Sequence, residues 1–207
     1  MEFDNHDERI RYVELALDRF DLEGIAEPPL PQGYRFVLYQ PGDREHWIAI
    51  EQSAKELVSH EQGLRVWADY YAAHEASLPQ RMFFIENPQG EKVATATAFF
   101  DVKGIDPPSI GYLHWVAVRR DHQGLRLARP LIAHTLLRLR DLGYTHVRLH
   151  TQTTTWLACK LYLDFGFRPT ADSARTGAAG WRIVKALTHH PALADVPEAA
   201  PDEIIGG

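Results

Sequence analysis

The chain contains a single cysteine, Cys159, among its 207 residues, and it has no hydrophobic run long enough to cross a membrane. One cysteine cannot form a disulfide within the chain, which excludes a disulfide-stapled scaffold and a CxxC metal or redox module. A membrane-spanning helix needs about 20 consecutive apolar residues, and no such stretch is present. The first nine residues, MEFDNHDER, are polar and acidic, unlike a secretory signal peptide. We therefore expect a cytoplasmic protein.

The sequence also lacks a strong charge bias and a metal motif. The net charge is −6, and the acids are concentrated at the two ends, which leaves 15 acids and 19 bases in residues 29–188. This small basic excess suits a phosphorylated small molecule, whereas a nucleic-acid surface needs a clear basic stripe. None of the 11 histidines belongs to an HExxH motif. We predict no metal, and neither nucleic acid nor membrane as a partner.

What is present is an ordinary globular composition, with 45% hydrophobic and 24% charged residues. The length fits one domain with extensions. We expect a helical extension and connector at 1–33, one domain at 34–187, and a tail at 188–207. The tail consists mainly of Ala, Pro and acids, with little to bury, so we expect it to be disordered.

Hydrophobic spacing predicts that the first eighty residues are mainly helical. In residues 6–20, four apolar side chains recur at intervals of three or four, which is typical of one helix face: Ile10, Val13, Leu17 and Phe20. A proline-rich connector, EPPLPQG, follows. Beyond it we expect a strand at 34–40 and two helices, at 43–57 and 61–78.

The rest of the chain alternates between strands and helices. Residues 81–87 and 93–102 form a predicted hairpin, and 110–118 form a further strand. After that we expect a helix at 127–142, a strand at 146–152, a helix at 156–165 and a closing strand at 180–187. This order predicts an α+β fold, with a mixed, mostly antiparallel sheet flanked by helices. The second half contains a βαβ unit, with a right-handed parallel crossover over 110–152.

The segment from Val116 to Leu131, VAVRRDHQGLRLARPL, is the most informative for function. A strand ends at Val118, and a short turn leads directly into a helix. The first turn of a helix offers unpaired backbone N–H groups and the positive end of its dipole, which together bind anions such as phosphate. Gly124 allows a backbone to approach a ligand closely. A plain strand-to-helix turn remains the alternative.

At these residues the sequence resembles the GNAT acetyltransferase superfamily. The family's acetyl-CoA signature has Gln or Arg, two residues, Gly, one residue, and Gly or Ala; Gln123 and Ala128 match it, and Arg126 replaces the central glycine. A second block, TWLACKLYLDFGF, matches the family's later motif in the spacing of Ala158, Tyr162 and the Gly-Phe pair at 166–167, with Thr155 in place of Asn. We expect Thr155, Ala158 and Tyr162 to line a functional stripe, with Leu157, Leu161 and Phe165 facing the core.

The resemblance implies that acetyl-CoA binds between two splayed strands, the one ending at Val118 and the one at 146–152. Backbone groups of three residues would pair with the pantetheine arm: Val116, Ala117 and Val118. The following loop and helix start would hold the pyrophosphate: Gln123, Gly124, Leu125, Arg126, Leu127, Ala128 and Arg129. Thr155 and Tyr162 would lie near the thioester.

The resemblance also implies a general acid and a general base. Tyr162 stands where many family members keep the acid that protonates the departing sulfur. Some members carry a base on the strand at 110–118, and strand alternation places Tyr112, His114 and Val116 on one face. We choose His114 as the base, because its ordinary pKa lies near 6.5, and His150 is the second candidate. The alternatives are a hydrogen-bonded core histidine and an ordinary half-buried tyrosine.

We therefore predict an N-acetyltransferase that transfers an acetyl group from acetyl-CoA to an amine by direct transfer in a ternary complex. Five residues at 61–78 are candidate walls of the acceptor pocket: Trp67, Tyr70, Tyr71, His74 and Glu75. Cys159 is expected to pack, not to react. Two alternatives stay open, a non-catalytic CoA-binding sensor or interaction domain and an acyltransferase for longer acyl-CoA. The acceptor is a small amine, an amino acid, an antibiotic or a protein N-terminus. For the helix expected in 1–28 two alternatives stay open, packing against its own domain and packing against a second copy in a homodimer.

Overall fold

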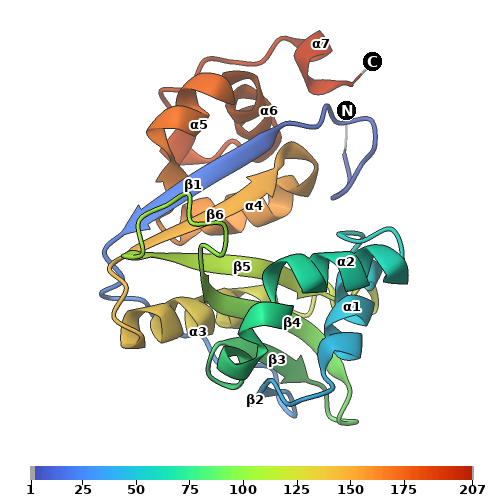
Figure 1. The fold of residues 1–207 in the computed structure, drawn as a ribbon. Coiled ribbons are helices and arrows are strands. Elements are labelled where there is room, and N and C mark those ends of the chain that lie inside the picture. Colours follow the sequence, from blue (N-terminus) through green and yellow to red (C-terminus); the bar gives the residue numbers. More distant parts are fainter. Residues whose placement is uncertain (1–2, 207) are drawn as a thin grey trace. The chain divides into compact units, whose positions relative to one another are not determined.

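The computed structural model describes residues 3–206, which divide into two compact units (Figure 1). The larger unit is Leu22–Val147, and the smaller unit comprises the residues up to Asp21 and those from Arg148 onward. The strands pair mostly antiparallel and are flanked by helices, so the fold is α+β, as predicted. No helix within residues 3–206 has both the length and the apolar character that a membrane span requires.

Four strands of the larger unit form an antiparallel sheet in the order β2-β3-β4-β5. They are β2 (Arg35–Leu38), β3 (Met82–Glu86), β4 (Lys92–Phe100) and β5 (Ile110–Val118). β3 and β4 form the predicted hairpin. The Asn87 side chain accepts hydrogen bonds from the backbone N–H groups of Gln89 and Glu91, at 3.0 and 2.9 Å, which fixes the tight turn.

Helices cover both faces of this sheet (Figure 1). On one face lie α1 (Arg44–Ser53), α2 (His60–Tyr70) and the 3-10 helix η1 (Ala72–Gln80). On the other face, α3 (Ala128–Asp141) packs on β4 and β5. The first layer is rich in buried aromatic rings, including Trp47, Trp67 and Tyr71. The second is aliphatic and is centred on Ile85, Val93, Ala94, Ala96, Leu127 and Leu131.

The two helices of the aromatic layer are shorter than the predicted spans 43–57 and 61–78. α1 ends at Ser53, and Lys55 adopts a left-handed conformation with φ +67° that cannot continue a helix. α2 begins after Ser59, whose Oγ accepts a hydrogen bond from the Gln62 N–H at 3.1 Å. The segment after Tyr71 tightens into η1, which contains Pro79. The predicted helix at 127–142 is confirmed as α3.

The smaller unit is built on three strands in the order β6-β1-β7. They are β1 (Glu14–Phe20), β6 (His146–Gln152) and β7 (Arg168–Pro169). β1 and β7 are antiparallel, and the Asp18–Arg148 and Val13–Thr153 contacts at the two ends of β1 show that β1 and β6 are antiparallel too. β6 and helix α4 (Trp156–Asp164) lie where they were predicted. The parallel crossover over 110–152 runs from one unit into the other and stays a prediction.

The helix predicted at 6–20 is wrong, because this segment contains strand β1. Leu15 and Leu17 are buried at a spacing of two, as in a strand, whereas Phe20 is 67% exposed. The period of three or four from Ile10 to Phe20 was therefore coincidental. Because residues 3–28 contain no helix, the structural basis for a homodimer through a helix in this segment is also lost.

The strand predicted at 180–187 is also wrong, because residues Ala178–Thr188 form helix α6, after the short helix α5 (Ala171–Thr176). Its buried residues cluster on one helix face: Gly180, Trp181, Ile183 and Val184. The Trp181 indole N–H donates to the backbone oxygen and the Oγ of Ser173, at 3.2 and 3.1 Å. The apolar residues of this segment therefore form the buried face of a helix, and this helix packs on α4 and β1.

The tail predicted to be disordered packs instead on the smaller unit. Leu193, in the 3-10 helix η4 (Pro191–Leu193), is 1% exposed. Lys185 pairs with Glu198 at 2.8 Å, and Arg182 pairs with Glu203 in helix α7 (Pro201–Ile204). Composition underestimated this segment because it does not reveal the contacts that hold it, which also include the buried His190 paired with Asp164 at 3.1 Å and the β-bridge between Ile10 and Ile205.

Candidate functional site

The end of β5 leads through a short 3-10 turn, η2 (Arg120–His122), into α3, as the sequence predicts. The Gln123 side chain donates to the Val118 carbonyl at 3.1 Å and closes this turn. Gly124 and Arg126 are both exposed and left-handed, with φ +79° and +62°. The first intrahelical bond is donated by Leu131 to Leu127, at 3.2 Å. The backbone N–H groups of the first turn therefore have no partner within the helix.

Arg126 occupies the position at which the family signature has glycine. A left-handed conformation costs a non-glycine residue about 1–2 kcal/mol. Arg126 nevertheless adopts the left-handed conformation that glycine adopts easily, so an arginine at this position does not prevent that backbone shape. Strained backbone of this kind is concentrated at binding and active sites.

β5 carries a bulge beside this loop. Thr95 lies opposite Ala117 and Thr97 opposite His114, so Trp115 and Val116 together face one residue of β4. Trp115 is left-handed, with φ +47°. A bulge leaves backbone groups without a partner in the strand ladder and changes the direction of the side chains that follow.

The bulge overturns part of the predicted strand alternation. Tyr112 and Ala117 both belong to the aromatic layer, and Trp115 packs against it, whereas Val116 and Val118 pack against the aliphatic layer with Leu127. Val116 therefore does not share a face with Tyr112 and His114. The extra residue shifts the alternation by one position after Trp115.

His114 is half-buried within a set of aromatic rings. Its Nδ1 lies 2.9 Å from the Tyr71 hydroxyl, which also donates to Thr97 Oγ1 at 3.2 Å. Phe99 stacks on the imidazole at 5.7 Å and an interplanar angle of 16°, and Tyr70 lies 5.0 Å away. Burial raises the pKa of Tyr71 well above 10, so its phenol stays protonated. His114 is thus both oriented by a hydrogen bond and partly accessible.

The predicted acceptor walls divide into core and surface residues. Trp67 and Tyr71 are buried and belong to the core. Tyr70 is partly exposed beside His114, and His74 packs edge-on against Phe99 and Phe100. Glu75 is exposed and accepts a short hydrogen bond from the Tyr39 hydroxyl. Of the five, Tyr70 best fits a wall beside His114.

Sequence reasoning missed Glu51, a fully buried acid on α1. Its side chain is 0% exposed, and neither carboxyl oxygen has a hydrogen-bond partner among residues 3–206. Burial raises the Glu51 pKa well above its ordinary value of 4.5, and the nearby Glu56 adds to the shift. Its sequence position, four residues after the buried Trp47 on one helix face, was the available signal.

Tyr162 and Thr155 lie in the smaller unit, at α4 and the 3-10 helix η3 (Thr153–Thr155) before it. Tyr162 is 7% exposed and meets the Phe167 ring edge-on at 6.1 Å. Thr155 Oγ1 lies 3.0 Å from both Thr151 Oγ1 and the Gln152 carbonyl. Both residues are therefore held in fixed positions.

The predicted faces of α4 are reversed. Leu157, expected to face the core, is 44% exposed, whereas Thr155, Cys159 and Tyr162 are buried. Burial raises the pKa of Cys159 to about 12, which keeps it an inert thiol. His150, the second candidate base, is exposed on β6. No three His, Cys, Asp or Glu side chains gather as a metal site in the part of the chain that the structure describes.

Comparison with known proteins gives one consistent result. Residues 44–167 match the model of the acetyltransferase (GNAT) family. Mycothiol acetyltransferase from Sanguibacter keddieii is 30% identical over 155 residues, which are 72% of this chain and 49% of that protein. N-acetyltransferase 8F1 from Rattus norvegicus is 37% identical over 98 residues, which are 46% and 42% of the two chains. The chain thus spans about half the length of these curated relatives.

Solved structures agree at the level of the fold. A GCN5-related N-acetyltransferase from Sphaerobacter thermophilus superposes with a TM-score of 0.62 at 19% identity, over 78% of this chain and 49% of that one. The ribosomal-protein-S18-alanine N-acetyltransferase from Escherichia coli gives a TM-score of 0.51 at 20% identity, over 67% and 79%.

Proposed function

This chain belongs to the acetyltransferase (GNAT) family, and we propose that it transfers an acetyl group from acetyl-CoA to an amine acceptor within a ternary complex. The observation that carries this proposal is the exposed loop after β5, in which Gly124 and Arg126 are both left-handed before the open first turn of α3. Consecutive backbone N–H groups in such a loop form an anion-binding concavity. A CoA pyrophosphate is a fitting occupant.

We assign the binding of acetyl-CoA to residues that the sequence already singled out. The backbone of Gln123 to Arg129 holds the pyrophosphate, and the backbone of Val116 to Val118 pairs with the pantetheine arm. The bulge at Trp115 supports the second assignment, because it leaves strand N–H and C=O groups without a ladder partner. Thr155 completes the set as a residue of the thioester environment.

The reaction requires two proton transfers. The amine nitrogen attacks the thioester carbon, the C–S bond breaks, the amine loses a proton and the sulfur gains one. We assign the first transfer to His114 and the second to Tyr162. Because Tyr71 donates to Thr97, the His114 Nδ1–H donates to the Tyr71 oxygen, and Nε2 keeps the lone pair that accepts the amine proton. The Tyr162 hydroxyl supplies the proton for the sulfur.

Substituting His114 tests its role as the base. His114→Ala should lower kcat/KM by about a hundredfold or more at neutral pH and by less at high pH, where more of the amine is already neutral. His60→Ala is the control, because His60 is an exposed histidine that pairs with Glu45 on the surface. An equal loss at every pH, together with a lower melting temperature, would show that His114 is a core residue.

Two further expectations remain proposals, a cytoplasmic location and a homodimer. The homodimer stays a prediction, and gel filtration with light scattering tests it directly.

A further inference from the structure

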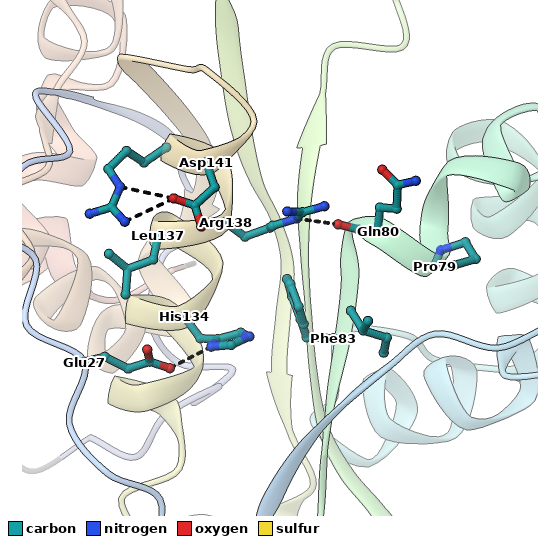
Figure 2. A pocket seen from close by; sticks show the side chains of 10 residues that line it. Glu27, Pro79, Gln80, Phe83, His134, Leu137, Arg138 and Asp141 are labelled. Carbon is teal, nitrogen blue, oxygen red and sulfur yellow. Dashed lines mark hydrogen bonds and ion pairs between the residues drawn. The ribbon is translucent and has the colours of Figure 1, made fainter.

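A surface depression of about 380 Å³ lies on the α3 face of the larger unit (Figure 2). It is bordered by α3, by β3 and by the end of η1, and its lining includes Leu38, Phe83 and Leu137. His114 belongs to the opposite face of the sheet, with the aromatic layer. The depression is therefore separate from the proposed acetyl-transfer site, and its volume lies at the small end of the range for ligand pockets.

Arg138 supplies a guanidinium that is anchored by one hydrogen bond to a backbone carbonyl. Its Nε donates to the Gln80 carbonyl at 2.7 Å, and Figure 2 shows the side chain reaching from α3 to that residue. Among residues 3–206, no carboxylate forms an ion pair with its guanidinium. One anchored donor fixes the plane of the group, and the two terminal nitrogens remain as a fork that matches a carboxylate.

His134 lies one helical turn before Arg138 on the same face of α3. Phe36 stacks on its ring at 4.0 Å and 11°, and Phe83 meets it edge-on at 4.5 Å. Its Nδ1 lies 2.6 Å from the Glu27 carboxylate, and Nε2 has no hydrogen-bond partner in the described part of the chain. The imidazole is thus fixed by two aromatic rings and at one nitrogen, and its second nitrogen is available to a ligand.

The charges around the depression favour a singly charged anion. Arg140 is paired with Asp141 at 3.1 Å, and Glu27 is paired with His134. When His134 is neutral, the charged side chains around the depression sum to zero: Glu27, Asp141, Arg138 and Arg140. When His134 takes up a proton, the sum becomes positive. Glu27 and Asp141 also line the depression, and their charges repel a doubly charged phosphate more than a singly charged carboxylate. Leu38, Leu137 and Pro79 suit an apolar body on that carboxylate.

We propose that this depression is a binding site for a small monocarboxylate with an apolar body, held by the Arg138 fork and by His134 Nε2. Because Nδ1 donates its proton to Glu27, Nε2 becomes a donor only when His134 takes up a proton. Binding is therefore coupled to protonation and strengthens as the pH falls. Glu27 is the charged group that contacts His134, and Arg138, Arg140 and Asp141 are the other charged groups that line the depression. The aromatic neighbours of His134, Phe36 and Phe83, are neutral.

NMR titration of the full chain with hexanoate tests the proposal, with inorganic phosphate as the comparison anion. We expect hexanoate to shift the His134 ring and Arg138 Nε–H signals saturably, more tightly at pH 6 than at pH 8. Because Arg138→Gln removes a charge-assisted contact, it should weaken binding about tenfold or more. Arg140→Gln is the matched control and should change the affinity less than threefold. His134→Gln should abolish the pH dependence.

Three results would overturn the proposal. The first is no saturable shift of either signal with hexanoate. The second is equal weakening by Arg138→Gln and Arg140→Gln, which would indicate a diffuse charge effect. The third is tighter binding of phosphate than of hexanoate, which would exclude the monocarboxylate. None of these readouts depends on acetyl transfer, so they stand apart from the proposed activity.

Discussion

Replacing Glu51 with glutamine should change how the stability of the protein depends on pH. The Glu51 side chain is 0% exposed, and neither of its carboxyl oxygens has a hydrogen-bond partner within residues 3–206. Burial, with Glu56 adding to it, raises the pKa of Glu51 well above 4.5 in the folded protein. In the unfolded chain the carboxyl is solvated and titrates near its ordinary value.

The size and direction of the effect follow from this difference in pKa. The stability that neutral Glu51 contributes is fully present below about pH 4.5 and is lost as the pH rises through the folded-state pKa. Between these limits the unfolded chain releases one proton that the folded protein keeps. The free energy of unfolding therefore falls by about 1.4 kcal/mol per pH unit. Glutamine cannot ionise, so the variant does not show this fall.

Urea unfolding at a series of pH values measures the effect. The unfolding free energy of Glu51→Gln minus that of the wild type should grow as the pH rises from 5 to 6, with about 1.4 kcal/mol per pH unit as the upper limit. The cost of burying the glutamine amide does not depend on pH. It therefore cancels when only the change of the unfolding free energy with pH is compared. Glu61→Gln is the control, since Glu61 is 81% exposed and pairs only with Arg65 on the surface. Parallel pH curves for wild type and Glu51→Gln would refute the reasoning.

Three further predictions follow from the smaller unit. Tyr162→Phe keeps the ring contact with Phe167 and should lower turnover by about ten- to a thousandfold with acetyl-CoA affinity nearly intact; wild-type turnover in steady-state assays would remove Tyr162 from the mechanism. Leu193→Ala should cost about 2–5 kcal/mol in urea unfolding, and a loss below about 0.5 kcal/mol would show that the tail does not pack. Cys159 should resist a thiol reagent at pH 8 until urea is added, since burial raises its pKa to about 12; rapid labelling of the folded protein would contradict this.

The part of the fold from β3 to α4 could be predicted because its local signals agree with its tertiary environment. α3 has a clear helical stripe with Ile132, Leu136 and Leu139 buried, and left-handed Gly143 and Gly166 follow α3 and α4. Where local signals were ambiguous, the prediction failed. Leu17 fits both a helical stripe with Val13 and a strand alternation with Leu15. Pairing of this segment with β7 stabilises the strand.

The geometry of the candidate site was less accessible from the sequence. No glycine or proline marks the bulge at Trp115, so the shift in alternation that turns Val116 away from His114 had no local signal. His114 was chosen from its place on a strand, but its partner Tyr71 lies 43 residues earlier and is brought to it only by packing of the aromatic layer. The loop at Gln123 to Ala128 was found because its chemistry is contained in consecutive residues.

The most direct test of the account is whether the purified chain transfers acetyl groups. The chain is incubated with acetyl-CoA and a panel of amines, and released thiol and acetylated amine are quantified together. We expect at least one amine to yield product and thiol in equal amounts, in reactions that require both substrates. Binding of acetyl-CoA with no thiol release across the panel would contradict the proposed activity and favour a CoA-binding module, and the absence of acetyl-CoA binding at millimolar concentration would contradict the site itself.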